Sequence, residues 1–506
     1  MSRPVYRRRD SYILGLDVGT GSIHCLLADT LGRPITTASA PMAYYIPADC
    51  STLAREFEPQ AVMDALGQLV GKVLNRHGVH ARDVSAIGVT SQRQGVVFLD
   101  QDGGELYCGP NVDLRAIFEG AAIDEELGEE VYATTGHFPS FLLAPARLRW
   151  FREHRPMVYE NIRTVLSMAG WVAYRLTGSL MAEPSLEAEA GLLDINTGDR
   201  AAGLMEKLEV APSMLPPLPR NGLPTGNLSR GIADSLGLEP DIPVIVAGPD
   251  TQCGLLGMGI TQEGQAGAVV GWSGAIQALT AAPLLDKGKG SWAGLFPLDG
   301  LSVAESNLGD AGNAYRWLKD ILLGSNGSFG EAERLASEAS SAPEGVVTFL
   351  GPGPASALKT GLRMGGMFFP SPLSFQETSR GQLFRAALEN VAYSLKANLT
   401  TLQEVMGLEV KSLSLGGGMS ESRTLATTLA NVLALPVRCS SLPQVSASGA
   451  AMAASVSVVP SVSLEQVTRE AAADCEEIGP GSPGEIAEHQ NYYQQWLQLY
   501  NRLEWE

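Results

Sequence analysis

The residues best suited to chemistry lie near the N-terminus, where an apolar segment ends in a carboxylate and a turn of glycines and hydroxyls follows. Residues 12–17 end in Asp17, residues 19–22 read Gly-Thr-Gly-Ser, and a second apolar segment begins at Ile23. A carboxylate at a strand end can hold a hydrated magnesium ion, and glycine lets the backbone turn tightly and approach a phosphate. The pattern therefore indicates a hairpin for the phosphate tail of a nucleotide. An ordinary hairpin with a Gly-rich turn is the alternative that this segment leaves open.

A second segment repeats this plan in the other half of the chain. Residues 265–270 are predicted to form a strand, residues 271–274 read Gly-Trp-Ser-Gly, and residues 275–279 are predicted to form a returning strand. The match is in pattern more than in identity. It predicts two domains of one topology, each presenting a phosphate-facing hairpin to a shared cleft.

A third candidate is Asp250, which follows the apolar segment 242–247 and the dipeptide Gly248-Pro249. An apolar helix-like segment follows it, so Asp250 is expected where a helix begins, and the helix dipole favours its ionised form. A simple N-cap, which contributes roughly 1 kcal/mol, is the alternative.

The fourth feature is a run of three glycines, Gly416–Gly418, between a predicted strand at residues 410–415 and a predicted helix at residues 421–433. Glycines at such a junction let the backbone lie flat against a planar or anionic ligand, with the helix N-terminus directed at it. A flexible connection is the alternative.

Composition limits the class of protein. The chain has 506 residues, of which 45% are hydrophobic, and 36 basic against 55 acidic residues give a net charge of −19. This charge argues against nucleic acid or an anionic membrane as a partner, and no apolar stretch reaches membrane-spanning length. The six cysteines are scattered without a Cys-x-x-Cys pair, so we expect free thiols and a cytoplasmic location.

The elements that position these residues alternate between strand and helix, which predicts an α/β architecture. A chain of this length is expected to form two large domains. We place the N-terminal domain at residues 1–260, the C-terminal domain at 261–475, and a helical tail at 476–506. The expected strands and helices of the first part are strands at 12–17, 23–29 and about 34–40, and helices near 59–78, 113–127, 143–154 and 168–177.

The four features, in this order, resemble the FGGY carbohydrate kinases, relatives of the actin and heat-shock-chaperone ATPases. The resemblance covers residues 12 to about 455, and several local stretches are most similar to autoinducer-2 kinases. It implies two ribonuclease-H-like (actin-like ATPase) domains flanking a central cleft, with ATP mainly against the second domain and the sugar or polyol against the first. Mg²⁺ would accompany ATP, and a homodimer is left open as the assembly.

The resemblance also assigns roles residue by residue. Asp250 matches the catalytic base and Asp17 the magnesium-associated aspartate. The residues that match substrate contacts are Gln92, Arg93, Gln94, Asp113 and Arg115. The residues that match ATP contacts are Gly19, Thr20 and Ser22 in the first phosphate loop, Gly271 and Ser273 in the second, Gly416, Gly417 and Gly418 in the adenosine loop, and Asn431, where many members carry Asp.

Two residues depart from the family pattern. His24 stands where Lys or Arg is common, and Trp272 fills the place of a small or hydroxyl residue in the second phosphate loop.

We therefore expect a cytoplasmic ATP-dependent kinase that phosphorylates a hydroxyl of a small sugar, polyol or linear carbonyl compound. One alternative is a catalytically degenerate sensor of a sugar or nucleotide with the same fold, motivated by His24 and Trp272. A second is an actin- or chaperone-like ATPase that acts on protein partners. The polar set at residues 92–94 with Asp113 and Arg115 counts against the second, because it suits a small hydroxylated ligand.

Overall fold

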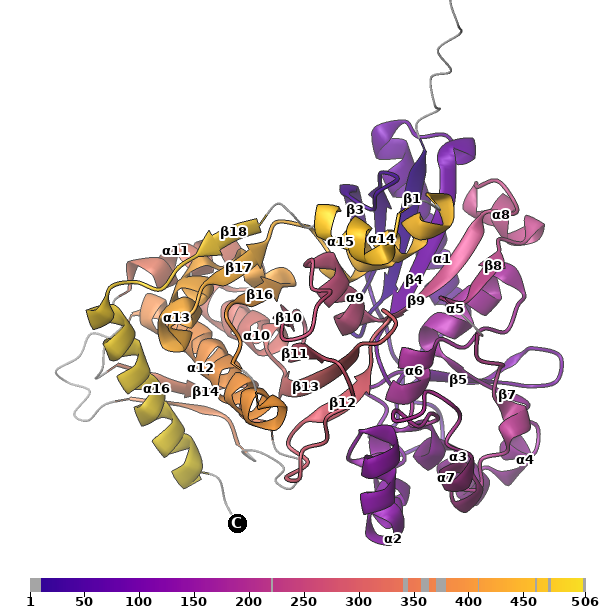
Figure 1. Ribbon diagram of the computed structural model, residues 1–506, viewed down its shortest axis with the longest axis horizontal. Helices are drawn as coiled ribbons and strands as arrows, with labels where there is room; N and C mark the ends of the chain where they lie inside the picture. Colours follow the sequence, from indigo (N-terminus) through magenta and orange to yellow (C-terminus); the bar gives the residue numbers. More distant parts are fainter. Residues whose placement is uncertain are drawn as a thin grey trace, which may run out of the picture. The chain divides into compact units, whose positions relative to one another are not determined.

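The computed structural model describes residues 11–219, 222–339, 345–355, 364–369, 379–407, 409–459, 462–471 and 475–503 (Figure 1). The chain divides into two compact units. Unit 1 consists of Met1–Thr261, Gly294–Leu301 and Leu442–Ala473, and unit 2 of Gln262–Ala293, Ser302–Ser441 and Asp474–Glu506. Within the described ranges, none of the helices combines the length and the apolar character that a membrane span requires.

Unit 1 is built on a six-stranded sheet in the order β3-β2-β1-β4-β9-β8. The strands β1 and β2 form an antiparallel hairpin, whereas β4 runs parallel to β1 and β9 parallel to β4. The central strands are apolar over nearly their whole length because helices cover both faces of the sheet. Their bounds are β1 (Tyr12–Val18), β2 (Ser22–Ala28), β3 (Pro34–Pro41), β4 (Val84–Ser91), β8 (Thr225–Asn227) and β9 (Pro243–Pro249).

One face of this sheet packs against α1 (Pro59–His77) and α5 (Met168–Thr177), and the other against α14 (Val445–Val458) (Figure 1). The helix α14 approaches so closely that a Cβ atom on Gly88 would lie 1.9 Å from the carbonyl oxygen of Ala450. Glycine is therefore required on the strand, and small residues such as Ala450 on the helix.

By their packing, α14 and α15 (Leu464–Ala471) belong to unit 1, whereas the sequence pattern places residues 442–473 in the second domain. The reason is that the alanine-rich face of α14 is buried against the sheet of unit 1, a long-range contact that local patterning does not reveal.

A small sheet, β6-β5-β7, adjoins the main sheet in unit 1 and carries an aromatic cluster of Phe98, Tyr107 and Phe151. Its strands are β5 (Val96–Leu99), β6 (Glu105–Gly109) and β7 (Thr164–Ser167). The remaining helices of unit 1 are α2 (Ile117–Thr135), α3 (Ala144–His154), α4 (Pro156–Tyr159), α6 (Pro184–Glu189), α7 (Ala202–Lys207), α8 (Arg230–Leu236) and α9 (Asp250–Gly257). The helix expected at 113–127 thus begins four residues later and continues to Thr135, where Gly136 ends it in the left-handed conformation.

Unit 2 repeats the plan of unit 1. Its sheet has the order β12-β13-β11-β10-β16-β17-β18, in which β10, β11 and β13 are antiparallel and β16 and β17 run parallel to β10. The order β13-β11-β10-β16-β17 corresponds to β3-β2-β1-β4-β9, so the predicted repeat of topology is confirmed. The strands of unit 2 are β10 (Ala266–Val270), β11 (Gly274–Thr280), β12 (Trp292–Leu295), β13 (Ser302–Gly309), β14 (Val347–Phe349), β15 (Gly366–Phe368), β16 (Leu413–Gly416), β17 (Val437–Ser440) and β18 (Cys475–Ile478).

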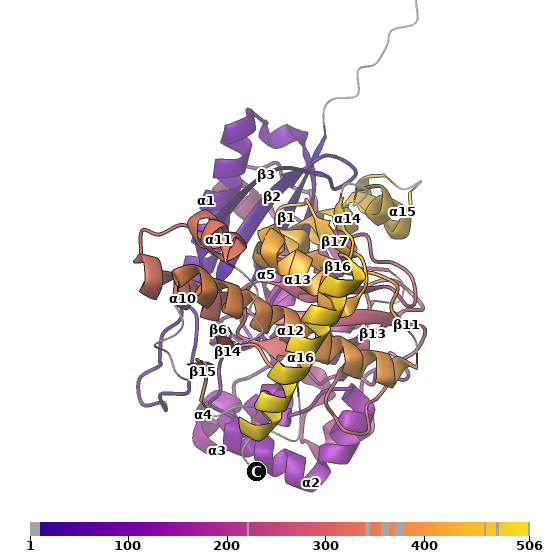
Figure 2. The same cartoon turned by 90° about the vertical axis from the view of Figure 1, so that its left-hand side faces the viewer.

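The C-terminal helix α16 (Pro483–Leu503), which forms most of the expected helical tail, packs into the core of unit 2. Its residue Trp496 is 2% exposed and donates a hydrogen bond to Asn390 of α12 (Arg380–Met406). Figure 2 shows α16 covering α12 and α13 (Arg423–Leu433). The two other helices of unit 2 are α10 (Gly312–Leu323) and α11 (Phe329–Glu338).

Candidate active site

Three parallel strands of unit 1 end side by side and place the candidate catalytic residues at one edge of the sheet. Asp17 of β1 lies opposite Thr90 of β4, and Thr90 lies opposite Gly248 of β9. The hydroxyl of Thr90 donates to the carbonyl of Gly248 at 2.7 Å, which ties β4 to β9 just before Asp250. Because the carboxyl ends of parallel strands meet at one edge, residues distant in sequence converge there.

Asp17 and Asp250 lie close enough to interact electrostatically. Burial, and then the charge of Asp250, raise the pKa of Asp17 well above its usual range. Asp17 is 7% exposed, and its Oδ1 has no hydrogen-bond partner in the described part of the chain. Such a buried acceptor beside a second carboxylate fits a hydrated divalent cation, which would supply the missing charge and ligands.

Asp250 is the first residue of α9, and Pro249 occupies the N-cap position. Asp250 therefore does not occupy the N-cap position, which was the alternative interpretation of this residue. The Oδ1 of Asp250 accepts a hydrogen bond from the backbone N–H of Thr251 at 2.7 Å, and the side chain is half-buried. The positive end of a helix dipole favours the ionised form of a carboxylate at a helix start.

The first phosphate loop is a tight turn, in which the N–H of Gly19 donates to the carbonyl of Ser22 at 3.0 Å. The hydroxyl of Thr20 contacts the side-chain amide of Asn111 at 3.0 Å. Ser22 Oγ lies 2.7 Å from Nε2 of His24, whose pKa is lowered by burial from 6.5 to about 4. His24 is therefore neutral at pH 7, so it does not replace the fixed positive charge that Lys or Arg would provide.

The loop at residues 92–94 follows β4 and is almost completely buried. Gln92 is 0% exposed, and its amide contacts Asn111 N–H at 2.8 Å and the hydroxyl of Tyr44 at 3.3 Å. Tyr44 in turn donates to the carbonyl of Thr20 at 2.7 Å. Gln92 thus connects the expected substrate loop to the first phosphate loop.

Arg93 and Gln94 both face Glu189, at the C-terminal end of α6. Arg93 Nη1 lies 3.8 Å from Glu189 Oε1, and Gln94 Nε2 donates to Oε2 at 3.4 Å. Gln94 has a φ of 60°, uncommon for a residue other than glycine, and the fully buried guanidinium of Arg147 donates to its carbonyl. The loop is therefore held in one conformation from both sides.

The sequence analysis did not identify Glu189, His137 or Gln252, which complete this polar cluster. Nε2 of His137 lies 3.1 Å from Glu189 Oε2, and Gln252 of α9 donates to Oε1 at 3.3 Å. Burial would raise the pKa of Glu189, but Arg93 and then His137 outweigh it and hold the pKa below its usual range. A sequence signal was present, because Glu183, Glu187 and Glu189 interrupt a segment otherwise rich in Ala and Leu.

Asp113 and Arg115 form a buried ion pair. Nε of Arg115 lies 2.7 Å from Asp113 Oδ2, and the other oxygen of Asp113 accepts the N–H of Arg55 at 2.9 Å. Tyr107 also donates to Asp113, and Arg115 pairs with Glu56 at 2.7 Å. Every strong acceptor and donor of this pair thus has a partner from the chain itself, so direct contact with a substrate stays a prediction.

In unit 2 the second phosphate loop is the turn between β10 and β11. The N–H of Gly271 donates to the carbonyl of Ser273 at 2.9 Å, and the N–H of Asn313 in α10 donates to the carbonyl of Trp272 at 3.0 Å. The Trp272 side chain is 38% exposed, and the guanidinium carbon of Arg316 lies 5.3 Å from its ring centre. This cation–π contact directs the indole along α10, and Ser273 is exposed beside it.

The triple glycine joins β16 to a short 3₁₀ turn before α13. Gly417 has a φ of 89°, and a Cβ atom there would lie 2.6 Å from the carbonyl of Val270, so no other residue fits. A Cβ on Gly418 would meet open space, which leaves this side of the turn accessible. The structure thus places Gly416–Gly418 beside the end of β10, the strand that leads into Gly271.

Asn431 does not lie at this turn. It follows the first residue of α13 by eight positions, which is about 12 Å along a helix. It is 3% exposed, and its Oδ1 accepts the N–H of Gly481 at 2.7 Å. The side chain connects α13 to the segment before α16, which gives it a structural role.

The arrangement in unit 1 therefore offers a half-buried carboxylate base, a second carboxylate suited to a metal ion and a rigid polar loop, while unit 2 offers two glycine turns. Phosphoryl transfer needs positioning and charge stabilisation more than covalent chemistry from the protein. These parts define a kinase of the actin-like ATPase fold.

Comparison with known proteins agrees. Residues 12–257 match the N-terminal domain, and residues 267–458 the C-terminal domain, of the FGGY family of carbohydrate kinases. The chain belongs to this family, and it is an ATP-dependent carbohydrate kinase. Nothing in the comparisons supports the degenerate alternative.

Two sets of relatives show the extent of the similarity. The autoinducer-2 kinase of Salmonella typhimurium is 27% identical over 504 residues, which cover 97% of this chain and 94% of that protein. The autoinducer-2 kinase of Escherichia coli K12 is 28% identical over 460 residues, covering 88% of this chain and 86% of that protein. The solved structure of xylulose kinase from Rhodospirillum rubrum is 25% identical, with a TM-score of 0.80 and coverage of 97% of this chain and 99% of that chain.

Proposed function

We propose that this kinase transfers the γ-phosphate of ATP to a hydroxyl of a small, linear polyhydroxy or carbonyl compound, with Asp250 as the general base. The observation that carries the proposal is the convergence of Asp250 with the Glu189 cluster. Gln252 lies two residues after Asp250 and bonds to Glu189, which contacts both Arg93 and Gln94. A hydroxylated acceptor held by Arg93 and Gln94 would thus lie next to the base.

The names of the relatives indicate a small polyhydroxylated acceptor. Proteins named autoinducer-2 kinases are similar to this chain, at 27–28% identity. Xylulose and gluconate kinases are among the similar structures, and their names also denote small polyhydroxylated compounds. We therefore propose for this chain the class of small polyhydroxylated acceptors and not a particular compound.

In the proposed mechanism, Asp250 accepts the proton of the attacking hydroxyl, a step that typically contributes roughly 10²–10⁴-fold. Asp17 would hold hydrated Mg²⁺, which when bound neutralises charge on the phosphates. The N–H groups and hydroxyls of Gly19, Thr20 and Ser22 would bind phosphate oxygens in unit 1, and those of Gly271 and Ser273 would do so in unit 2. The turn Gly416–Gly418 would lie against the adenosine.

Two expected residues receive positioning roles in this proposal. Asp113, saturated by Arg55, Tyr107 and Arg115, holds the segment that carries Asn111, which contacts Thr20. Gln92 holds the same segment, because its side-chain oxygen accepts the N–H of Asn111.

The cellular setting is proposed from composition and cysteine state. All six cysteines are free, which fits a reducing cytoplasm. The net charge of −19 favours neither nucleic acid nor an anionic membrane as a partner. The partners we propose are therefore ATP, the acceptor and, as an assembly still to be measured, a second copy of the chain.

The test is release of ADP from MgATP in the presence of single linear polyols, ketoses, aldonates and linear dicarbonyl-derived compounds. We expect one linear compound to stimulate release by at least tenfold over the rate with ATP alone. Stimulation only by cyclic sugars would contradict the linear acceptor. A flat response to every compound, with ATP bound by calorimetry, would contradict the kinase and favour the sensor.

A further inference from the structure

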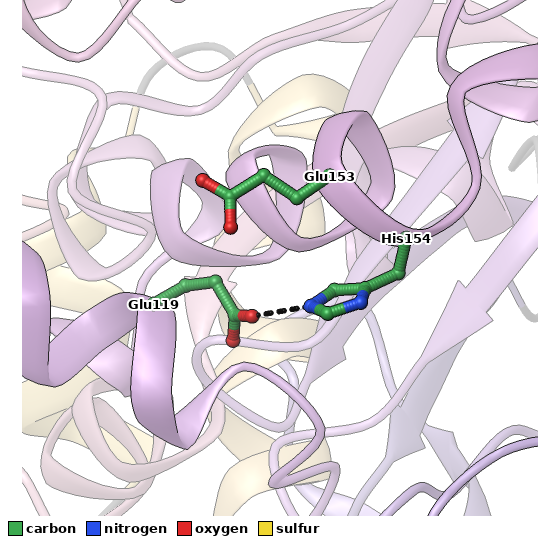
Figure 3. A group of neighbouring side chains, drawn as sticks. All are labelled: Glu119, Glu153 and His154. Atoms are coloured by element: carbon green, nitrogen blue, oxygen red, sulfur yellow. Dashed lines mark hydrogen bonds and ion pairs between the residues drawn. The ribbon is translucent and has the colours of Figure 1, made fainter.

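A group of potential metal ligands lies between α2 and α3, away from the strand ends that carry Asp17 and Asp250. Glu119 comes from the first turn of α2, and Glu153 and His154 are the last two residues of α3. One ligand atom from each lies within 4.8 Å of the others (Figure 3). In the part of the chain that the structure describes, no other three histidine, cysteine or acidic side chains come together in this way.

Glu119 provides independent evidence for a ligand. The residue is 6% exposed, its Oε1 lies 2.8 Å from Nε2 of His154, and its Oε2 is buried without a hydrogen-bond partner among the described residues. A buried carboxylate oxygen without a partner destabilises the fold, because its lost hydration is not replaced. A cation bound between the two helices would remove this cost. Figure 3 shows one oxygen of the Glu119 carboxylate directed toward the imidazole of His154, and Glu153 on the same helix as His154.

The donor set selects the kind of ion. One imidazole nitrogen and two carboxylates suit zinc, which binds them at about 2.0–2.2 Å in tetrahedral geometry. Ligand atoms in such a site are about 3.3 Å apart, so the Glu119–His154 pair at 2.8 Å needs only a small displacement. Mg²⁺ prefers oxygen ligands and keeps several waters, so the magnesium that accompanies ATP competes poorly here.

Glu153 and His154 also give access from solvent, because their side chains are 44% and 51% exposed. Glu153 pairs with Arg149 at 3.0 Å, and Arg149 also reaches Glu126 at 3.5 Å. An exposed pair of this kind contributes little to stability, so Glu153 can leave it for a metal while Arg149 keeps Glu126.

We propose that Glu119, Glu153 and His154 bind one zinc ion, with water in the fourth position, and that this ion fixes α2 against α3. The imidazole of His154 must be neutral to bind, so acidification would release the ion. The ion has a structural role in this proposal, because the three ligands lie on helices and not at the strand ends where the phosphoryl-transfer residues gather.

The experiment titrates metal-free full-length protein with ZnCl₂ in the presence of excess MgCl₂, using a chromophoric chelator as competitor. We expect one zinc per chain, an increase in Tm on zinc addition, and affinity at least about tenfold weaker in His154→Gln, as expected for loss of a ligand. His77→Gln, which changes an exposed histidine at the end of α1, is the matched control and should bind zinc like the wild type.

Further variants keep the proposal falsifiable. Glu153 is exposed, so Glu153→Gln should fold normally and should also weaken zinc binding. Glu119 is buried, so the zinc affinity of Glu119→Gln is interpreted only if its far-UV spectrum matches that of the parent. Equal affinity in the wild type and in His154→Gln would overturn the proposal, and so would absence of zinc binding in the wild type. A cobalt–thiolate absorption band in the Co²⁺-substituted protein would also overturn it, because it would assign the ion to cysteines.

Discussion

The carboxylates of Asp17 and Asp250 repel each other at the end of the central sheet of unit 1. Burial is the larger cause of the raised pKa of Asp17, and the charge of Asp250 is the second. Both carboxylates are brought there by the parallel strands β1, β4 and β9. The apoprotein therefore carries an electrostatic cost that a divalent cation would offset, which leads to the first prediction.

Asp17→Asn should stabilise the metal-free protein and abolish its response to magnesium. The raised pKa means that the folded state disfavours ionised Asp17. Ionisation of Asp17 therefore lowers the free energy of unfolding at neutral pH. This loss disappears as the pH falls through the folded-state pKa toward the pKa of the unfolded chain. Asparagine removes the charge at every pH. Thermal unfolding without magnesium should therefore show a higher Tm for the variant than for the wild type.

The control for Asp17→Asn is the same measurement with MgCl₂, which should raise Tm in the wild type and not in the variant. A variant that melts below the wild type without magnesium would contradict the electrostatic argument.

Asp250→Asn should reduce turnover by roughly 10²-fold or more, about 2.7 kcal/mol in barrier height, while ATP still binds. Asparagine keeps an oxygen to accept the N–H of Thr251, so the local fold is retained. Loss of the repulsion with Asp17 leaves Tm unchanged or slightly higher. Near-wild-type turnover, in a variant that binds ATP and melts like the parent, would show that Asp250 is not the base.

Glu189→Gln should raise KM for the acceptor by about tenfold, the equivalent of 1.4 kcal/mol, with little change in KM for ATP. The physical reason is that Glu189 holds Arg93 and Gln94 in place, and the neutral amide loses the charge that attracts Arg93. Steady-state kinetics with each substrate varied in turn measures this separation.

The matched control for Glu189→Gln is Glu187→Gln. Glu187 lies on the same helix, is 1% exposed and pairs with Arg200. This variant should lose stability comparably but keep the wild-type KM for the acceptor. Equal effects of the two variants on both KM values would assign Glu189 a structural role alone.

Ser273→Ala and Trp272→Thr should have opposite effects. Ser273 is exposed at the turn of the second phosphate loop. Ser273→Ala would remove one hydrogen bond to a charged group, so transition-state stabilisation should fall by roughly 1–3 kcal/mol and kcat/KM should fall with it. Trp272 is too bulky to approach a phosphate and packs near Arg316, so Trp272→Thr should retain or increase turnover. Calorimetry with ATP is the accompanying measurement; if only Trp272→Thr bound ATP, the sensor interpretation would replace the kinase.

His24→Asn should flatten the dependence of stability on pH between 6.5 and 4. Burial lowers the pKa of His24 from 6.5 to about 4, so in this window the unfolded chain binds a proton that the folded chain does not. The stability from neutral His24 is complete above pH 6.5 and is lost as the pH falls toward 4, by at most about 3 kcal/mol. Urea unfolding at several pH values measures the difference, and identical slopes for both proteins would refute the burial of His24.

The sequence by itself determined the two strand–turn–strand hairpins, the position of Asp250 and the family. These features are local: apolar segments predict strands, and glycines with hydroxyls between them predict tight turns. The turns at Gly19–Ser22 and Gly271–Ser273 therefore lie where the pattern placed them. The close packing of α14 on Gly88 was not visible, because it depends on a contact between residues more than 350 positions apart.

Only the tertiary structure decided which polar side chains share a site. Glu189 contacts Gln94, 95 residues away in sequence, and His137, 52 residues away, and no periodicity encodes such pairings. The same holds for Asn431, whose amide oxygen bonds to Gly481 and lies away from the glycine turn. Local patterns fix strands and turns because backbone geometry repeats along the chain, whereas buried charges obtain partners only when separate elements pack together.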